Sequence, residues 1–462
     1  MRRRRRAIIR RRARSVVPAS TIRRTRRSRR SRPASRGRWR FRPGRLIVLL
    51  VILGLLAAIA VGGAKLIERA LAGPRLAAPA STSLADFHGP LGSVVKGAIL
   101  VDADSGQVLV QKDADQPWPL ASVTKVMTMR VALKAIRDGK LSLDQQVLVP
   151  PEAAASNWPG SSLMFLKPGS RVKVRDLLYG MAVDSGNDAC VTLAVALSGS
   201  VDAFVAEMNK EAAAMGLTTA NFADPHGLSP DDRISARDMA RLARLYLRDF
   251  PEALTYHSTK EFTYGADALG TPVTQPNRNR LLWDYPGADG IKTGHTEEAG
   301  NNLVATAKRG QTRLIAVVFG APDAVGSMTG EAYRQRVATY LLDWGFTQLV
   351  AAKPLPPQGG EAVPSSMLVN KGAAGHVALT TTEGTTALVP KGLEGKVTAK
   401  PYFDRPYLVA PVTAGQPVGT LVMTLGEKEL YRTTMITAEA VPRGGLFRRA
   451  WDSVRLILRM GR

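Results

Sequence analysis

An uninterrupted apolar run near the N-terminus most constrains how this chain can fold. Residues 46–64 contain no charged side chain, and Arg45 and Lys65 flank them on either side. A run of this length can span a hydrocarbon layer of about 30 Å as a helix. The run therefore separates the segment before it from the body after it, and the two have to fold independently.

The segment before the run carries most of the charge of the chain. Residues 1–45 contain 21 arginines and neither lysine nor acid, so most of the net charge of +26 belongs to this tail. Such an arm can neutralise nucleic-acid phosphates, lie against anionic lipid headgroups, or stay disordered and fix membrane topology. The apolar run that follows favours the last interpretation and argues against a nucleic-acid partner, because positive charge is retained on the cytoplasmic side.

We therefore expect a disordered cytoplasmic tail at 1–45 and a transmembrane anchor at 46–64. A linker rich in Ala, Pro, Ser and Gly follows at 65–92, and the remaining chain lies outside the cytoplasmic membrane. A cleaved signal peptide is the alternative, with small-residue sites near 62–64 or 70–72. Its apolar stretch exceeds the usual ~7–15 residues, which favours the retained anchor.

The body begins with strands, continues with helices and returns to strands. Residues 97–102 and 107–110 read as a hairpin, and the stretches 290–293, 303–307 and 314–319 read as further strands joined by short connections. Helical patterns lie between them, at about 122–138, 175–198, 201–215 and 235–248, and one more follows at about 330–343. This order predicts an α+β domain over 93–350 with an antiparallel sheet and a helical subdomain.

The C-terminal part has two further elements. Residues 361–442 consist of short β-rich segments punctuated by Gly and Pro, which predicts a small all-β domain. Residues 444–462 predict an amphipathic helix. Its apolar stripe is Phe447, Trp451, Val454 and Leu458, and its polar arc is Arg448, Asp452, Arg455 and Arg459. Leu456 breaks the pattern. A helix packed on its own domain or a partner-binding helix is possible, but terminal aromatic residues and arginines favour a membrane-interface helix.

The residues most often found in redox and metal sites are sparse. Cys190 is the only cysteine, so the chain forms no intramolecular disulfide, and its apolar neighbours predict a buried, inert thiol. The five histidines are scattered without ligand spacing, so we expect no catalytic metal and no other cofactor.

Three short motifs carry the candidate chemistry. Ser122 and Lys125 stand three residues apart at the expected start of a helix, which puts both side chains on one face. A lysine whose pKa is lowered by burial can remove the proton from a serine hydroxyl. Alone, this spacing is common by chance in a long chain.

The other two motifs gain meaning from their order along the chain. The Ser185 hydroxyl could relay a proton to a leaving amine, and the Asn187 amide could orient the substrate. The segment also suits an ordinary turn between helices. Lys292 and Thr293, followed by Gly294, could hold a carboxylate, although an edge strand also favours a lysine. Together with Ser122 and Lys125, the three motifs occur in one order and in suitable structural contexts.

The set resembles the signature of penicillin-binding proteins and serine β-lactamases. The stretches 119–128, 185–190, 225–228, 235–239, 277–279 and 289–296 are similar to low-molecular-mass penicillin-binding proteins, the serine-type D-alanyl-D-alanine carboxypeptidase family. The resemblance covers about 93–462 and implies the penicillin-binding transpeptidase fold. It also implies a role in building the peptidoglycan wall, on stem peptides, with covalent binding of β-lactam antibiotics. The long arginine tail departs from the family's short signal peptide.

Carried over by position, the resemblance implies a role for each motif residue. Ser122 would form the acyl-enzyme, Lys125 would be its general base, and Ser185 would pass the proton to the departing D-alanine. The implied substrate-binding residues are Asn187, Lys292, Thr293, Gly294, His295 and Arg237, with Arg237 as support for the site. The backbone N–H groups of Ser122 and His295 would form the oxyanion hole.

Three rival interpretations stay open at this point. A class A β-lactamase uses a glutamate to activate the deacylating water, and the comparable stretch 221–227 contains none, which favours a carboxypeptidase. An endopeptidase that cuts cross-links would share every motif. The chain could also be an arginine-tailed membrane scaffold with an inert enzyme-like domain, although the complete set of motifs argues against it.

Overall fold

The structure is a computed structural model that describes residues 85–86, 94–265, 271–355 and 363–459. The expected tail at 1–45, the anchor at 46–64 and all of the linker except 85–86 lie outside the described residues, and the three expectations stay predictions.

A six-stranded sheet is the centre of the first domain. Its strand order is β1-β3-β2-β12-β11-β10, and every neighbouring pair is antiparallel except β1 with β3. β10 is therefore an edge strand. The strands are β1 (Ala85–Asp86), β2 (Gly97–Asp102), β3 (Val108–Lys112), β10 (Ala288–Thr296), β11 (Gly300–Arg309) and β12 (Thr312–Ala321). The expected α+β class with an antiparallel sheet is confirmed.

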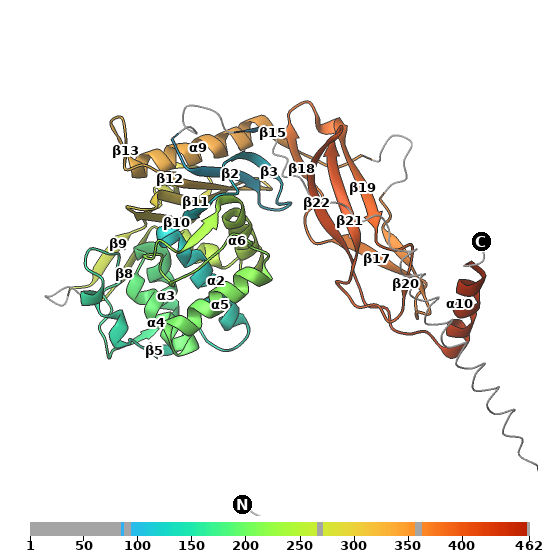
Figure 1. The fold of residues 1–462 in the computed structure, drawn as a ribbon, viewed down its shortest axis with the longest axis horizontal. Coiled ribbons are helices and arrows are strands. Elements are labelled where there is room, and N and C mark those ends of the chain that lie inside the picture. The colour runs from blue at the N-terminus through green and yellow to red at the C-terminus, as the bar shows by residue number, and fades with distance from the viewer. Residues whose placement is uncertain (1–84, 87–93, 266–270, 356–362, 460–462) are drawn as a thin grey trace, which may run out of the picture. The chain divides into compact units, whose positions relative to one another are not determined.

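Both faces of this sheet are covered by helices (Figure 1). The helix α9 (Gly330–Gln348) packs on one face, and α2 (Lys125–Arg137) and α6 (Ala236–Asp249) lie on the other, each with its own buried apolar cluster. Successive residues of each strand contribute to the two clusters alternately, since side chains of a strand point to opposite faces in turn. Cys190 is buried in the helical region, as predicted.

The helical region is completed by short elements. Its helices are α3 (Val174–Tyr179), the π-helical turn η4 (Gly180–Asp184), α4 (Asn187–Ser198), α5 (Val201–Ala214), α7 (Ala253–His257) and α8 (Leu281–Asp284). Three two-stranded pairs border them: β4 (Pro117–Pro119) with β7 (Arg233–Ser235), β5 (Gln146–Leu148) with β6 (Arg171–Lys173), and β8 (Glu261–Tyr264) with β9 (Val273–Pro276). A further pair, β13 (Ala324–Val325) with β14 (Met328–Thr329), lies against α9.

Of two local details, the first differs from the sequence expectation, whereas the second, a break in the helical pattern at the Ser185 motif, was expected. The expected helix at 122–138 starts as a 3₁₀ turn, η1 (Ala121–Thr124), and becomes α-helical only at Lys125. The expected helix at 175–198 is interrupted by η4 and by Ser185, which adopts a left-handed conformation with φ of 60°. Both breaks coincide with the serine-containing motifs.

The C-terminal domain is a second, all-β unit with its own apolar core. Its sheet has the order β19-β21-β22-β17-β16-β20, and β18 pairs instead with β15 (Leu349–Ala352), which follows α9 directly. The elements are β16 (Ser366–Asn370), β17 (His376–Thr381), β18 (Ala387–Pro390), η5 (Glu394–Lys396), β19 (Val397–Phe403), β20 (Leu408–Val409), β21 (Pro417–Leu425) and β22 (Lys428–Thr437).

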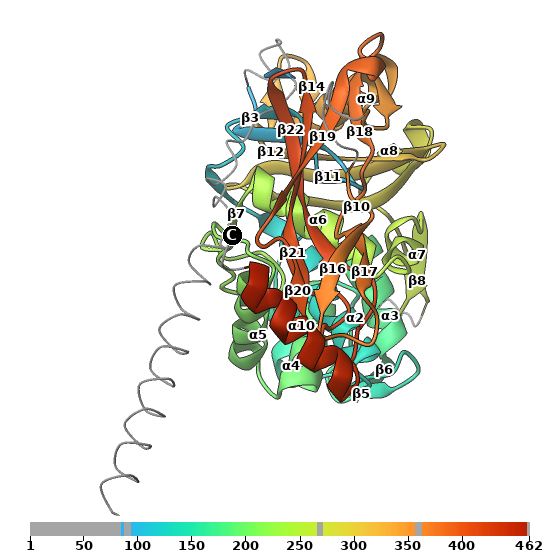
Figure 2. The same ribbon diagram turned by 90° about the vertical axis from the view of Figure 1, so that its right-hand side faces the viewer.

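The chain ends in the helix α10 (Leu446–Arg459), which lies beside β16 (Figure 2). Its polar side faces the β domain, because the buried Asp452 accepts a hydrogen bond from the Lys371 backbone N–H at 2.6 Å. Its apolar side faces outward, with Phe447 95% exposed and Trp451 64% exposed. The described part of the chain contains no single helix long and apolar enough to cross a membrane; α4 and α5 reach that length only as a pair bent by 86°.

Candidate active site

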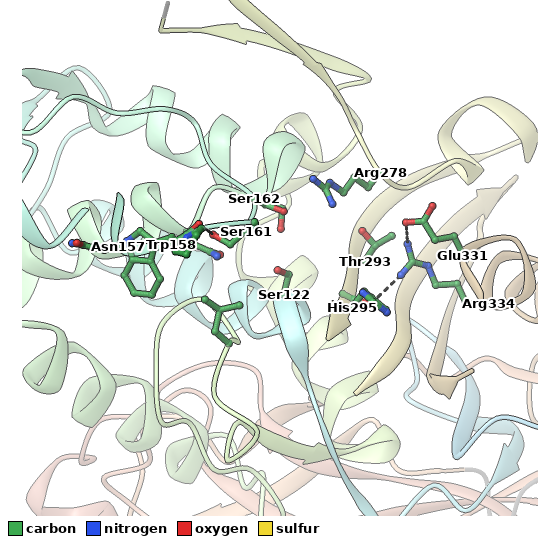
Figure 3. A pocket seen from close by; sticks show the side chains of 16 residues that line it. Ser122, Asn157, Trp158, Ser161, Ser162, Arg278, Thr293, His295, Glu331 and Arg334 are labelled. Atoms are coloured by element: carbon green, nitrogen blue, oxygen red, sulfur yellow. Dashed lines mark hydrogen bonds and ion pairs between the residues drawn. The ribbon is translucent and has the colours of Figure 1, made fainter. Parts of the chain in front are cut away.

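A cavity of about 400 Å³ lies between the edge strand β10 and the helical region. Figure 3 shows Ser122 in the middle of it, with Thr293 and His295 of β10 on one side and Trp158 on the other. The motif residues Ser185, Asn187 and Gly294 also line it. One cavity thus collects residues from all three motifs, although they are spread over more than a third of the sequence.

Ser122 is paired with Lys125 inside this cavity. The Lys125 Nζ lies 3.0 Å from the Ser122 Oγ. Positions i and i+3 eclipse one another in a 3₁₀ turn, so η1 aligns the two side chains more directly than an α-helix would. Among the described residues, four serines line the cavity: Ser122, Ser161, Ser162 and Ser185. Of these four, Ser122 is the one whose hydroxyl contacts a lysine amine.

The environment of Lys125 favours its neutral form. Its side chain is fully buried, and burial is the largest cause of a pKa below that of a free lysine; Arg278 lowers the pKa further. The Nζ also contacts the Asn187 Oδ1 and the His226 carbonyl oxygen, each at 2.7 Å. These contacts fix the amine beside Ser122, where a neutral lysine can act as a general base.

A loop beneath the nucleophile supplies the carbonyl that contacts Lys125. The Asp224 carboxylate accepts hydrogen bonds from the backbone N–H groups of His226 and Ser229, both at 2.7 Å. Gly227 has φ of 92°, and a Cβ at this position would lie 1.8 Å from the Ala121 carbonyl oxygen. Only glycine therefore lets this loop pass under η1.

The second motif is held by the acid that follows it. The Asp188 carboxylate accepts hydrogen bonds from the backbone N–H groups of Met164 and Leu166, both at 2.9 Å, and thereby ties α4 to the wall of the cavity. Ser185 and Asn187 are both 2% exposed and line the cavity, and the Asn187 Oδ1 accepts a hydrogen bond from Lys125. The αL conformation of Ser185 marks a locally strained backbone, as is common at functional sites.

Asp184, directly before Ser185, is a buried acid beside the site. Burial, and next the neighbouring Asp188, raise its pKa to about 8, whereas the cations Lys292 and Arg278 act in the opposite direction. Its Oδ1 has no hydrogen-bond partner among the described residues. We therefore expect Asp184 to be largely neutral at pH 7.

The third motif lies on the edge strand. Thr293, Gly294 and His295 line the cavity, and Lys292 lies behind them, 3% exposed, with its Nζ donating to the Thr293 carbonyl at 3.2 Å. Burial and then the charge of Lys125 hold the Lys292 pKa well below that of a free lysine. The His295 Nε2 is bound to the Asp323 carboxylate at 2.8 Å, so the imidazole is tied to the neighbouring loop.

Gly294 explains why the third motif contains a glycine. A Cβ at this position would lie 2.9 Å from the Leu120 carbonyl oxygen and 3.0 Å from the Ser122 backbone N. The edge strand therefore packs directly against the backbone of the nucleophile. This contact brings the Gly294–His295 peptide next to the Ser122 N–H.

Arg237 is the one expected site residue that the structure places elsewhere. It lies in the first turn of α6, where its Nε is bound to Asp115 at 2.6 Å and its Nη2 to Gln111 at 2.5 Å. It lines a separate cavity and not the one that contains Ser122. The expectation that Arg237 supports the substrate site is corrected: the motif around it caps α6, since Ser235 Oγ accepts the Asp238 N–H at 3.1 Å.

Two other arginines occupy the cavity wall, and sequence reasoning gave neither a role. Figure 3 shows Arg278 and Arg334 on either side of Thr293. Arg278 is held in a tight turn, because the Asn279 N–H donates to the Asn277 Oδ1 at 3.0 Å. The repeated asparagines around Arg278 were a signal for such a turn, whereas nothing in the sequence marked Arg334 within α9.

Comparisons with known proteins agree with this geometry. The family described as D-alanyl-D-alanine carboxypeptidase matches residues 91–323, and the C-terminal domain of penicillin-binding protein 5 matches residues 356–443. The chain is 39% identical over 363 residues to D-alanyl-D-alanine carboxypeptidase DacC of Escherichia coli K12, covering 78% of this chain and 87% of that protein. It is 35% identical over 356 residues to DacF of Bacillus subtilis 168, covering 76% and 86%.

Among solved structures, penicillin-binding protein 5 from Haemophilus influenzae is similar with a TM-score of 0.63 and 35% identity. The match covers 80% of this chain and 100% of that chain.

Proposed function

This chain belongs to the D-alanyl-D-alanine carboxypeptidase family, and from that membership we propose that it acts through an acyl-enzyme on Ser122. The enzyme is a serine-type D-Ala-D-Ala carboxypeptidase, a penicillin-binding hydrolase of peptidoglycan stem peptides. The observation that carries the mechanism is the 3.0 Å contact between Ser122 and the fully buried Lys125.

Acylation follows from the positions of the first two motifs. Neutral Lys125 takes the Ser122 proton while the Oγ attacks the carbonyl carbon of the penultimate D-alanine. The backbone N–H groups of Ser122 and His295 stabilise the oxyanion. Ser185 passes a proton to the nitrogen of the departing D-alanine, and Asn187 orients the substrate amide. Water then hydrolyses the ester and restores the free serine.

Cationic and hydroxyl side chains on one side of the cavity can bind the free carboxylate at the C-terminus of the substrate. Lys292 and Thr293 are adjacent on β10, and Arg278 lies beside Thr293 in the cavity wall (Figure 3). A carboxylate between such groups gains charge-assisted hydrogen bonds. We propose that Arg278 joins Lys292 and Thr293 in binding this carboxylate.

The test is intact-mass spectrometry of the protein incubated with a penicillin, together with D-alanine release from a pentapeptide. We expect one stable penicilloyl adduct, mapped by peptide digestion to Ser122, and free D-alanine. Rapid penicillin turnover without D-alanine would instead identify a β-lactamase, and release only from cross-linked dimers an endopeptidase. The absence of any adduct would support the inert-domain interpretation.

We also propose that the enzyme works at the outer face of the cytoplasmic membrane. The order of arginine tail and apolar run in the sequence supports this orientation. The exposed apolar side of α10 supports a second contact, because Phe447, Trp451 and three neighbouring arginines suit an anionic lipid surface.

Removing the apolar side chains of α10 should weaken vesicle binding. In a chain of residues 68–462, Phe447→Ser with Trp451→Ser should reduce partitioning into anionic phospholipid vesicles by about 100-fold or more, since burying each of the two aromatics contributes about 1.5–3 kcal/mol. Co-sedimentation with vesicles measures this. Tyr340→Ser, at an aromatic of α9 that is 46% exposed, is the control and should change nothing. Equal binding of the double variant would exclude α10 as the contact.

A further inference from the structure

Arg334 is a buried cation without an adequate counter-charge. It is 1% exposed, and its nearest carboxylate among the described residues, Glu331, lies 3.5 Å away and is itself 62% exposed. Its Nε has no hydrogen-bond partner in the described chain. Burial lowers its pKa to about 10, so it stays charged at pH 7. Burying a charge without a close partner costs free energy. We therefore expect this charge to serve a function.

The direct hydrogen bond of Arg334 goes to the peptide that ends in the third motif. Its Nη1 donates to the Gly294 carbonyl oxygen at 2.9 Å. The Gly294 carbonyl and the His295 N–H are the two ends of one planar peptide and point in opposite directions. A guanidinium on the carbonyl therefore fixes the direction of the N–H. It also makes that N–H a stronger donor, since linked hydrogen bonds polarise one another.

Further side-chain contacts hold the residues next to this peptide. The Asn301 Oδ1 lies 3.5 Å from the Arg334 Nη1, and the Asn301 Nδ2 donates to the Asp323 carboxylate at 2.9 Å. That carboxylate also binds the His295 imidazole, and His295 is paired with Asn301 across the sheet. The His295 residue is thus fixed at its side chain and at the carbonyl before it.

We infer that Arg334 is a positioning residue of the oxyanion hole, acting through the Gly294–His295 peptide to orient and polarise the His295 N–H. The inference rests on the proposed function, in which that N–H and the Ser122 N–H bind the oxyanion. The packing of Gly294 against the Ser122 backbone places the two donors side by side. Negative charge develops on the substrate oxygen during acylation, so the effect of Arg334 is largest in the transition state.

The variant Arg334→Gln should slow acylation by about 10- to 100-fold, less than the 10²–10³-fold of a deleted oxyanion donor. Two acyl-D-alanyl thioesters separate this role from carboxylate binding. Their leaving groups differ only in a free carboxylate or its methyl ester. The inference predicts equal loss of kcat with both. Loss confined to the carboxylate-bearing thioester would make Arg334 a substrate ligand and overturn the inference, as would no loss.

Infrared spectroscopy of the penicilloyl-enzyme measures the stretching frequency of the acyl carbonyl, which depends on the hydrogen bonds that the oxyanion hole donates to it. A weaker His295 donor should raise the stretching frequency of the acyl carbonyl in Arg334→Gln, and Arg334→Lys should restore part of the shift. An unchanged frequency in Arg334→Gln would overturn the inference. Arg336→Gln, two residues along α9, is the matched control.

A variant outside the core guards against misfolding of Arg334→Gln. Glu331→Gln removes the nearest carboxylate among the described residues, at an exposed position. The Arg334 charge is then no longer partly neutralised and polarises the peptide more strongly, so the acyl carbonyl frequency should fall. A rise or no change in frequency would count against the inference. If the wild-type protein formed no adduct, the proposed function would fail instead, which is a separate result.

Discussion

Ser122→Ala should abolish the penicilloyl adduct and reduce D-alanine release by about 10⁴-fold or more, a loss typical of removing a nucleophile from a coupled catalytic unit. The remaining groups of the cavity can still bind the substrate, but no hydroxyl is left beside the Lys125 amine. Intact-mass spectrometry and a coupled assay for free D-alanine measure the two losses.

Two serine variants show whether the loss is specific to Ser122. Ser185→Ala should retain the adduct and form it more slowly, because the proposed function gives Ser185, which lines the cavity, a role in proton transfer and not the acyl group. Ser170→Ala, at an exposed hydroxyl bound to the Lys167 carbonyl at 2.6 Å, should behave as wild type. An adduct that persisted in Ser122→Ala but disappeared in Ser185→Ala would reassign the nucleophile.

The three motifs and the fold class could be predicted because they depend on local sequence. Turn residues and apolar alternation marked the strands that form the sheet. The first two motifs fall where a helix begins or is interrupted, whereas the third lies within the strand β10. The contact of Gly294, the glycine of the third motif, with the nucleophile segment was not among the predictions. In the structure that glycine packs against the Ser122 backbone N.

The arginines could not be assigned because their position depends on tertiary packing. Arg237 lies in a stretch that resembles the family, yet α6 directs its side chain to Asp115 and Gln111. Arg334 follows the third motif by 40 residues and looks like any helical arginine in the sequence. Only the packing of α9 on the sheet brings its guanidinium to Gly294. Similarly, Asn302 on β11 fixes the nucleophile segment by donating to the Pro119 and Leu120 carbonyls.

Lys125→Met should reduce acylation by a penicillin and by a pentapeptide by about 10³- to 10⁴-fold, since the base that activates Ser122 is lost. The methionine preserves the length of the side chain but leaves the Asn187 Oδ1 and the His226 carbonyl without their shared donor. Each unsatisfied buried acceptor destabilises the fold by about 1–3 kcal/mol. Thermal unfolding of the variant has to be measured beside its kinetics.

The pH dependence and a second variant distinguish a base from a fixed positive charge. A lysine acts as a base only when neutral, so wild-type acylation should rise as the pH increases through the lowered pKa of Lys125. The rising limb should vanish in Lys125→Met. Lys125→Arg keeps a cation that never deprotonates in this range, and it should be nearly as slow as Lys125→Met. Substantial acylation by the arginine variant would mean that position 125 acts through its charge, and the proton of Ser122 would then need another acceptor.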